Sequence, residues 1–129
     1  MRQNSLNEAP YKKLIVWQNA RILRKKIYDI TRGFSKSEYR RVSQMNDAAR
    51  SVKQNIQEGY GQTLPKYINA LRNIAKPSLS ELRGDIDDCY EDNLISESEF
   101  KDLDSLCCKT DYLFMKLIRS LENRRKEQK

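Results

Sequence analysis

The chain has 129 residues and a formal net charge of +7, with 25 lysines and arginines against 18 aspartates and glutamates. This length suits one domain with a single core. The chain has only four glycines and three prolines, and valine, isoleucine and threonine do not alternate along it as they do in strands, so a sheet is disfavoured. Histidine is absent, which excludes Ser-His and Cys-His nucleophiles and the Glu-x-x-His ligands of di-iron bundles.

The amino-terminal residues are polar and contain Pro10, which is unlike a signal peptide. The longest strongly apolar run, Leu14 to Trp17, is far too short to span a membrane. The three cysteines, Cys89, Cys107 and Cys108, are too few for a disulfide framework. We therefore expect a cytoplasmic protein with reduced thiols and no membrane contact.

The first predicted helix covers residues 13–32 and follows a flexible arm at 1–11. Its apolar residues keep the gaps of three and four that are typical of a bundle seam: Val16, Ala20, Leu23, Ile27, Ile30 and Phe34. Ile15 and Ile22 lie off this seam, and Trp17 flanks it. These three residues favour an oligomer interface, and a wide core face is the alternative.

The second predicted helix covers 36–59. Ser35 and Glu38 have the spacing of a capping box, and Gly59 stands where a left-handed cap is usual. Its apolar stripe consists of Val42, Met45, Ala49, Val52 and Ile56.

The third predicted helix covers 65–92 and contains Pro77. Proline lacks a backbone N–H and clashes with the preceding turn, so a kink or break is expected near Lys76. The apolar stripe consists of Ile68, Leu71, Ala75, Leu79, Leu82, Ile86 and Cys89.

A clear turn signal separates the third helix from the fourth. Asn93 suits a left-handed cap, Ser96 and Glu99 form a capping box, and Ile95 with Phe100 fits a hydrophobic staple. The fourth helix then carries an apolar stripe of Phe100, Leu103, Cys107, Thr110, Phe114, Leu117 and Leu121.

The fourth helix is predicted to cover 96–123, with a flexible basic tail at 124–129. Four long helices with short connections predict an all-α, up-down-up-down antiparallel four-helix bundle. The bundle would form a single domain over 1–129.

Charge is unevenly distributed along the chain. Residues 1–77 carry sixteen basic and five acidic side chains, whereas residues 78–105 carry two basic and ten acidic ones. In an up-down bundle the acidic third turn shares an end with the basic first turn. We expect the two to compensate within one chain, and contact between subunits of a ring is the alternative.

No constellation in the sequence supports catalysis. The carboxylates of Asp85, Asp88 and Asp92 share a helix face, but a solvated acidic face explains them better than a metal site. Cys107 lies in an apolar stripe, so we expect it to be a small core residue and not a reactive thiol. We expect a protein that is not an enzyme and uses no cofactor or metal.

Basic side chains cluster in the first two predicted helices, with tyrosines between them. Basic groups contact phosphates, and aromatic rings stack on unpaired bases. The predicted nucleic-acid contacts are Arg24, Lys25, Arg40, Arg41, Arg50 and Lys53, with Tyr39 as a stacking partner.

Five segments resemble a known bacterial family. Three match well: LIVWQNA at 14–20, IYDITRGF at 27–34 and AARSVKQNIQEGYGQ at 48–62. AKPSLSEL at 75–82 and NLIS at 93–96 match more weakly. The sequence is similar to the small proteins encoded in intervening sequences of large-subunit ribosomal RNA genes, which are also labelled S23 ribosomal proteins.

The resemblance implies a non-catalytic four-helix bundle that assembles into a ring-shaped homopentamer with a basic surface. It also implies kinship with accessory proteins of diversity-generating retroelements, which bind nucleic acid (RNA or RNA–DNA) and a reverse transcriptase. The chain departs from the family pattern at Asn46 and Asp47, where a basic pair is usual. Basic residues of the first helix would have to compensate.

Two functions follow from these observations. The first is an oligomeric basic protein that binds RNA or a ribonucleoprotein through the cations named above. The second is an oligomeric scaffold that docks a protein and does not bind nucleic acid directly.

Overall fold

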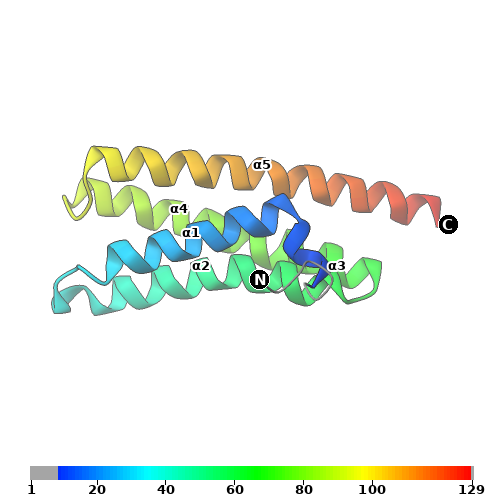
Figure 1. Cartoon of the computed structure of the whole chain (residues 1–129), viewed down its shortest axis with the longest axis horizontal. Helices are drawn as coiled ribbons and strands as arrows, with labels where there is room; N and C mark the ends of the chain where they lie inside the picture. The colour runs from blue at the N-terminus through cyan, green and yellow to red at the C-terminus, as the bar shows by residue number, and fades with distance from the viewer. Residues whose placement is uncertain (1–8, 129) are drawn as a thin grey trace, which may run out of the picture.

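The computed structural model describes residues 9–128, which fold as a bundle of helices (Figure 1). The helices are α1 (Ile15–Thr31), α2 (Tyr39–Tyr60), α3 (Leu64–Ala70), α4 (Lys76–Glu91) and α5 (Glu97–Glu127). The flexible arm was predicted over residues 1–11, and residues 1–8 of it lie outside the described range. The end of the arm is ordered, contrary to the prediction, because Pro10–Lys13 forms a 3-10 turn and Tyr11 packs against the core.

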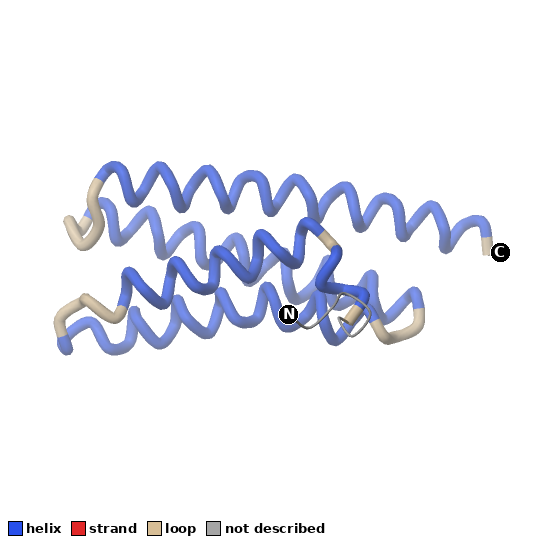
Figure 2. The backbone as a smooth tube through the Cα atoms, viewed as in Figure 1, coloured by secondary structure: helices blue, strands red, loops and turns tan. Residues whose placement is uncertain are grey.

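The helices close into a ring of neighbours. α1 packs against α2 and α5, α2 against α4, and α4 against α5. The colour gradient shows that successive long helices run in opposite directions (Figure 1). The connections α1–α2 and α4–α5 lie at one end of the bundle and α2–α3 at the other (Figure 2). The predicted all-α four-helix bundle is confirmed.

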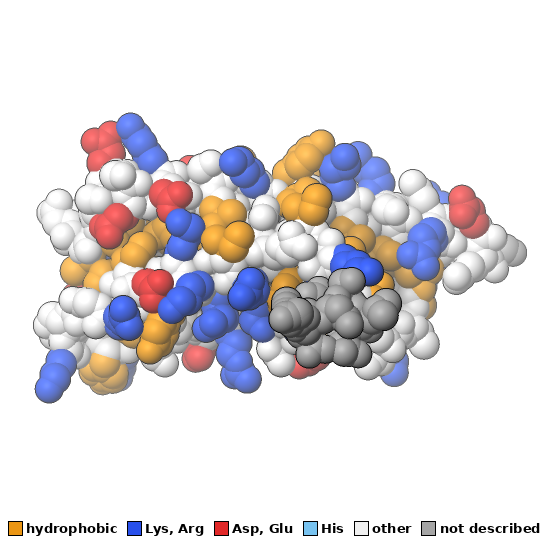
Figure 3. Space-filling model, viewed as in Figure 1, with side chains coloured by type: hydrophobic (Ala, Val, Ile, Leu, Met, Phe, Trp, Pro, Cys, Tyr) orange, Lys and Arg blue, Asp and Glu red, His pale blue; other side chains and the backbone are white. Residues whose placement is uncertain are grey.

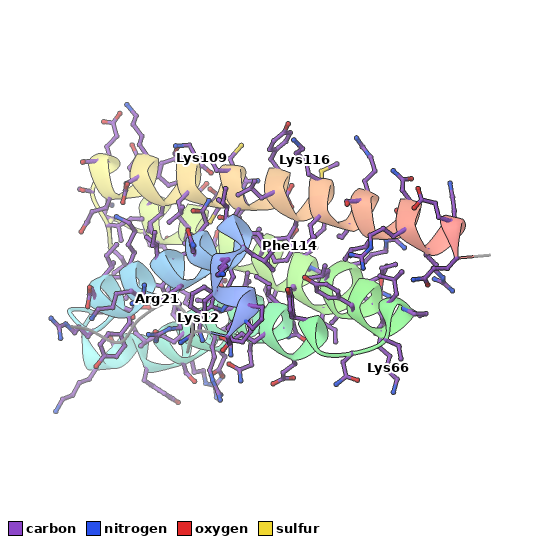
Figure 4. The ribbon with its side chains drawn as sticks, turned by 45° about the vertical axis from the view of Figure 1, so that its right-hand side comes forward. Lys12, Arg21, Lys66, Lys109, Phe114 and Lys116 are labelled. Carbon is purple, nitrogen blue, oxygen red and sulfur yellow. The ribbon has the colours of Figure 1, made fainter. Side chains whose placement is uncertain are left out.

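The core follows the predicted stripes closely. Fully buried side chains come from every helix of the ring: Leu23, Ile27, Val52, Ile56, Leu71, Leu79, Leu82, Leu103, Cys107 and Phe114. Phe114 points from α5 into the bundle (Figure 4). Burial of such side chains contributes about 1.5–3 kcal/mol each before the entropy cost of folding.

The third long helix is interrupted where the sequence predicted a kink. A π-helical turn, Leu71–Ala75, joins α3 to α4, and the N–H of Lys76 donates to the carbonyl of Leu71, five residues back. Pro77 follows in the first turn of α4. Proline has no N–H and cannot donate the regular helical hydrogen bond. The π-helical turn therefore lies next to a position where the α-helical hydrogen-bond pattern is already broken.

Two predicted caps are wrong and two are confirmed. The Ser35 hydroxyl accepts from the N–H of Ser37 and caps a 3-10 turn, while Glu38 bonds Arg41, so no capping box forms there. At α5 the reciprocal bonds of the Ser96–Glu99 capping box are present. Asn93 adopts the predicted left-handed conformation, with φ of 60°.

The prediction that Gly59 caps α2 in a left-handed conformation is wrong. Its φ is not positive, and α2 continues through it to Tyr60. A Cβ at this position would lie 2.9 Å from Cδ1 of Tyr67 and 3.2 Å from Cβ of Ala70. Glycine is therefore needed for the close approach of α3, and not for a turn.

The prediction of a flexible carboxy-terminal tail is also wrong. Residues expected to fray from 124 onward continue α5 as regular helix to Glu127. This end of α5 extends past the rest of the bundle (Figure 1). The basic residues Arg124, Arg125 and Lys126 lie in its last turn, where they complement the helix dipole.

Opposite charges meet within one chain, as expected. Arg41, at the first turn, bonds Asp92, at the third turn, over 2.9 Å. Lys26 of α1 pairs with Asp102 of α5 at 2.8 Å. Part of the acidic segment is thus neutralised inside the protomer.

Candidate functional site

A hollow of about 470 Å³ lies between α1 and α2 and collects cations. We call it the basic groove, and its lining consists of Tyr11, Lys12, Trp17, Arg21, Arg24, Arg50, Lys53, Gln54 and Gln57. Lys and Arg side chains gather over the middle of α1 and α2 (Figure 3). Lys12 and Arg21 lie on the same side of the bundle (Figure 4).

Helical spacing explains why these side chains converge. Arg21 and Arg24 are one turn apart on α1 and share a face. Arg50, Lys53 and Gln57 recur at gaps of three and four on α2. Because α1 and α2 pack against each other, the two cationic faces border the same groove.

The cations of the groove have no acidic neighbour among the described residues. The residues from 9 to 128 that line the groove include no aspartate or glutamate. Within residues 9–128, none of the five cations lies within ion-pairing distance of a carboxylate, whereas Lys25, Lys26 and Arg41 all do. The groove is therefore a locally positive surface, open to an anion.

Lys53 is half-buried, whereas Lys12, Arg21 and Arg50 are exposed. Burial lowers the pKa of Lys53, and the positive charges of Arg24, Arg50, Arg21 and Lys12 lower it further. An anion in the groove would relieve this repulsion and favour the charged ammonium.

Hydrogen bonds fix the floor of the groove. Oε1 of Gln57 accepts from Nε1 of Trp17 at 2.9 Å and from Nζ of Lys53 at 2.7 Å. The Lys53 ammonium also lies 5.9 Å from the centre of the Trp17 ring. The floor thus holds Lys53 at a defined place.

The structure brings together three of the predicted contacts, Arg24, Arg50 and Lys53. Sequence reasoning did not select Lys12 and Arg21, which border the same groove. The one-turn spacing from Arg21 to Arg24 was a usable signal, whereas Lys12 is placed by the 3-10 turn before α1.

The other predicted contacts lie elsewhere. Lys25 is 61% exposed and pairs with Asp29 of its own helix at 3.1 Å. Arg41 bonds both Glu38 and Asp92, each at 2.9 Å. Burial lowers the pKa of Arg41, but these hydrogen bonds raise it by more, so the net shift is upward. Arg41 therefore stabilises the turn end and is poorly placed to bind phosphate.

Tyr39 and Arg40 border a separate hollow between α2 and α4, which also contains Asp47 and Glu81. Its mixed charge makes it a weaker anion site than the basic groove. Asn46, at the position of a departure from the family pattern, has a structural contact, because its Nδ2 donates to Oγ1 of Thr31 at 2.9 Å and joins α2 to α1.

The predicted interface residues divide into two groups. Ile15 is 62% exposed and Ile22 is 45% exposed on the outer face of α1. Trp17 is only 8% exposed and belongs to the protomer's own core. The structure thus reassigns Trp17 from the predicted interface to the core and the groove floor.

Between residues 9 and 128, no group of three or more His, Cys, Asp or Glu side chains is arranged to hold a metal ion. No helix in the same range is long and apolar enough to cross a membrane. Cys107 is buried, as predicted.

The helix arrangement and the net charge place the chain among small basic proteins that fold as an antiparallel four-helix bundle. The chain belongs to the 23S rRNA-intervening sequence protein family, whose model matches residues 12–116. A comparison with curated proteins finds no match.

A solved structure with a similar fold is described as a protein with unknown function from the S23 ribosomal protein family of Bacteroides thetaiotaomicron. The TM-score is 0.74 at 17% sequence identity, over 81% of this chain and 96% of that one. This likeness supports the bundle fold.

Proposed function

We propose that this protein is a non-catalytic RNA-binding protein whose basic groove holds the phosphate backbone. The observation that carries the proposal is the convergence of five cations, from α1, α2 and the turn before α1, on one groove whose described lining has no carboxylate. The family name refers to a ribosomal RNA sequence, which agrees with an RNA partner.

The groove cations have distinct roles in this proposal. Arg21, Arg24 and Arg50 offer planar guanidinium groups that bind phosphate oxygens in pairs. Lys53, held by Gln57, acts as a point charge at the floor. Lys12, Arg40 and Tyr39 serve as outer contacts for a longer RNA. Binding is then driven largely by counterion release.

Fluorescence anisotropy of a labelled structured RNA across a salt titration tests the proposal, with molecular mass recorded on the same samples. The affinity should fall with salt, each neutralised phosphate adding about 0.7–0.9 to the log–log slope. Arg24→Glu with Arg50→Glu should reduce the affinity at least about tenfold and flatten the slope by about 2.

A charge-matched control uses Lys66→Glu with Lys109→Glu, two lysines on α3 and α5 that lie away from the groove (Figure 4). Both double variants change net charge equally, so non-specific attraction would weaken equally in both. An equal effect, or no binding even at low salt, would overturn the proposal.

The exposure of Ile15 and Ile22 supports a second proposal, a homo-oligomer assembled through the outer face of α1. The family resemblance suggests a pentamer, with RNA–DNA or a reverse transcriptase as further partners. Ile15→Asp and Ile22→Asp should lower the mass measured by light scattering while leaving the helical circular dichroism unchanged. An oligomer that persists in both variants would exclude this face. If the RNA titration shows no binding through the basic groove, the function to pursue is a protein scaffold without RNA affinity.

A further inference from the structure

A third hollow lies at the end of the bundle where α2 ends, α3 begins and α5 finishes. We call it the end pocket, with a volume of about 380 Å³ and a lining of Tyr60, Gln62, Leu64, Tyr67, Arg124 and Gln128. Its size lies within the range of small-molecule sites, about 300–1,000 Å³. The pocket combines aromatic rings, side-chain amides and a cation, which together suit a flat polar ligand.

Tyr67 carries the strongest sign of a missing partner. The residue is only 7% exposed, and its hydroxyl is buried without a hydrogen-bond partner among the described residues. Burial, together with the nearby Tyr60, raises the pKa of Tyr67 to about 12 against the opposing charge of Arg124. A buried hydroxyl that lacks a partner is costly, so a ligand atom that accepts from it would bind favourably.

The end pocket is joined to the basic groove by a row of aromatic rings. Tyr11 and Trp17 line the groove and have ring centres 5.4 Å apart. Tyr11 then lies 6.4 Å from Tyr60, and Tyr60 lies 5.9 Å from Tyr67 in the end pocket. The row of rings therefore runs from the lining of the cationic groove to the lining of the end pocket.

We propose that the end pocket receives an unpaired nucleobase of a single strand whose phosphates lie in the basic groove. This inference rests on the proposed function. Tyr60, which is 39% exposed, offers a stacking face. Gln62 and Gln128 offer amide donors and acceptors to the base edge, and the Tyr67 hydroxyl donates to it. Arg124 binds the adjacent phosphate.

The arrangement predicts a preference for single strands over duplexes. Bases in an RNA duplex are stacked and paired, and their edges face grooves that side chains read poorly. An unpaired base can leave its neighbours and enter a pocket. The groove alone would bind both forms through the backbone.

The test compares a fluorescein-labelled oligoadenylate with an RNA duplex of equal length, using the full chain. Tyr67→Phe should weaken binding of the single strand by about twofold to tenfold, the effect of one hydrogen bond, and leave duplex binding unchanged. Tyr60→Leu should weaken it by about tenfold or more through lost stacking. The matched controls are Tyr112→Phe and Tyr112→Leu, at a 60% exposed tyrosine on α5.

Thermal unfolding separates binding from folding. Tyr67→Phe removes a hydroxyl without a described partner, so its melting temperature should equal or exceed that of the wild type. Weaker binding by a protein of equal stability would then support the inference.

Failure of this inference differs from failure of the proposed function. If both probes bind equally and the Tyr60 and Tyr67 variants bind like the wild type, the end pocket is not a base site and the groove remains. If neither probe binds at low salt, both proposals are overturned.

Discussion

The indole N–H of Trp17 donates to Oε1 of Gln57 across 2.9 Å, which joins α1 to α2 beneath the basic groove. The same oxygen accepts from Lys53. One amide oxygen therefore satisfies a core aromatic residue and a groove cation together, which couples the packing of the bundle to the geometry of its binding surface.

Gln57→Leu should remove both hydrogen bonds while keeping side-chain volume. We expect the free energy of unfolding to fall by about 1–2 kcal/mol, because the indole N–H of the buried Trp17 loses its acceptor. Urea denaturation followed by the fluorescence of Trp17, the single tryptophan, measures this. Gln54→Leu is the control, since Gln54 lines the same groove without a hydrogen bond from its side chain to any described residue. Equal effects of the two substitutions would show that the bond to Trp17 contributes little.

Gly59 and Gly84 provide a matched pair of helical glycines. A Cβ at Gly59 would lie 2.9 Å from Cδ1 of Tyr67, so Gly59→Ala should destabilise the protein by about 1–3 kcal/mol through overpacking. A Cβ at Gly84 would meet no atom within 4 Å, so Gly84→Ala should stabilise by about 0.4–1 kcal/mol by restricting the unfolded chain. Chemical denaturation of both variants checks the opposite signs. Similar effects would show that α3 moves aside easily at Gly59.

The sequence predicted the fold well because the core stripes repeat over many residues. A single error in spacing does not change which face of a helix is apolar, so residues such as Leu23 and Leu103 were placed in the core correctly. The role of Gly59 could not be seen, because its neighbour Tyr67 comes from another helix. A local motif forms only when no other neighbour competes for its side chains, and Arg41, three residues further along, takes the Glu38 side chain that a capping box would need.

The site was only partly predictable, for a similar reason. Charge counting found the basic segments but not which cations are already paired. Arg40 and Arg41 are adjacent in sequence, yet Arg41 is tied to Asp92 and Arg40 borders another hollow. The Arg41–Asp92 pair joins residues that are distant in sequence, whereas Arg50 and Lys53 converge because one helix face carries both.

Arg41→Gln should therefore affect stability more than RNA affinity. Loss of the paired contacts to Glu38 and Asp92 should lower the free energy of unfolding by about 1 kcal/mol, since the pairs are partly exposed. Arg40→Gln, a change of the same charge at the next residue, should leave stability nearly unchanged. Urea denaturation with RNA anisotropy on both variants measures this, with Arg50→Gln as the groove reference. A loss of RNA affinity at Arg41 as large as that at Arg50 would contradict the structural role.

The three thiols should differ sharply in reactivity. Cys108 is exposed, whereas Cys89 and Cys107 are buried. Burial raises the pKa of Cys89, and it raises that of Cys107 to about 12, so neither thiol forms the reactive thiolate near neutral pH. An aromatic disulfide reagent at about pH 8 should label one thiol per native chain rapidly and all three in denaturant.

Cys108→Ser should abolish the rapid phase of labelling, and Cys107→Ala should leave it intact.

The pH dependence of stability provides a second check on Cys107. Its folded pKa lies above the ordinary value of 9.0, so the unfolded chain loses this proton first and stability falls as pH rises from about 9 toward 12. Cys107→Ala should be less stable overall, because it leaves a small cavity, but its stability should decline less steeply over this range. Rapid labelling of Cys89 or Cys107 in the native chain would show that α4 or α5, respectively, opens more readily than its packing indicates. An unchanged alkaline slope in Cys107→Ala would contradict the raised pKa of Cys107.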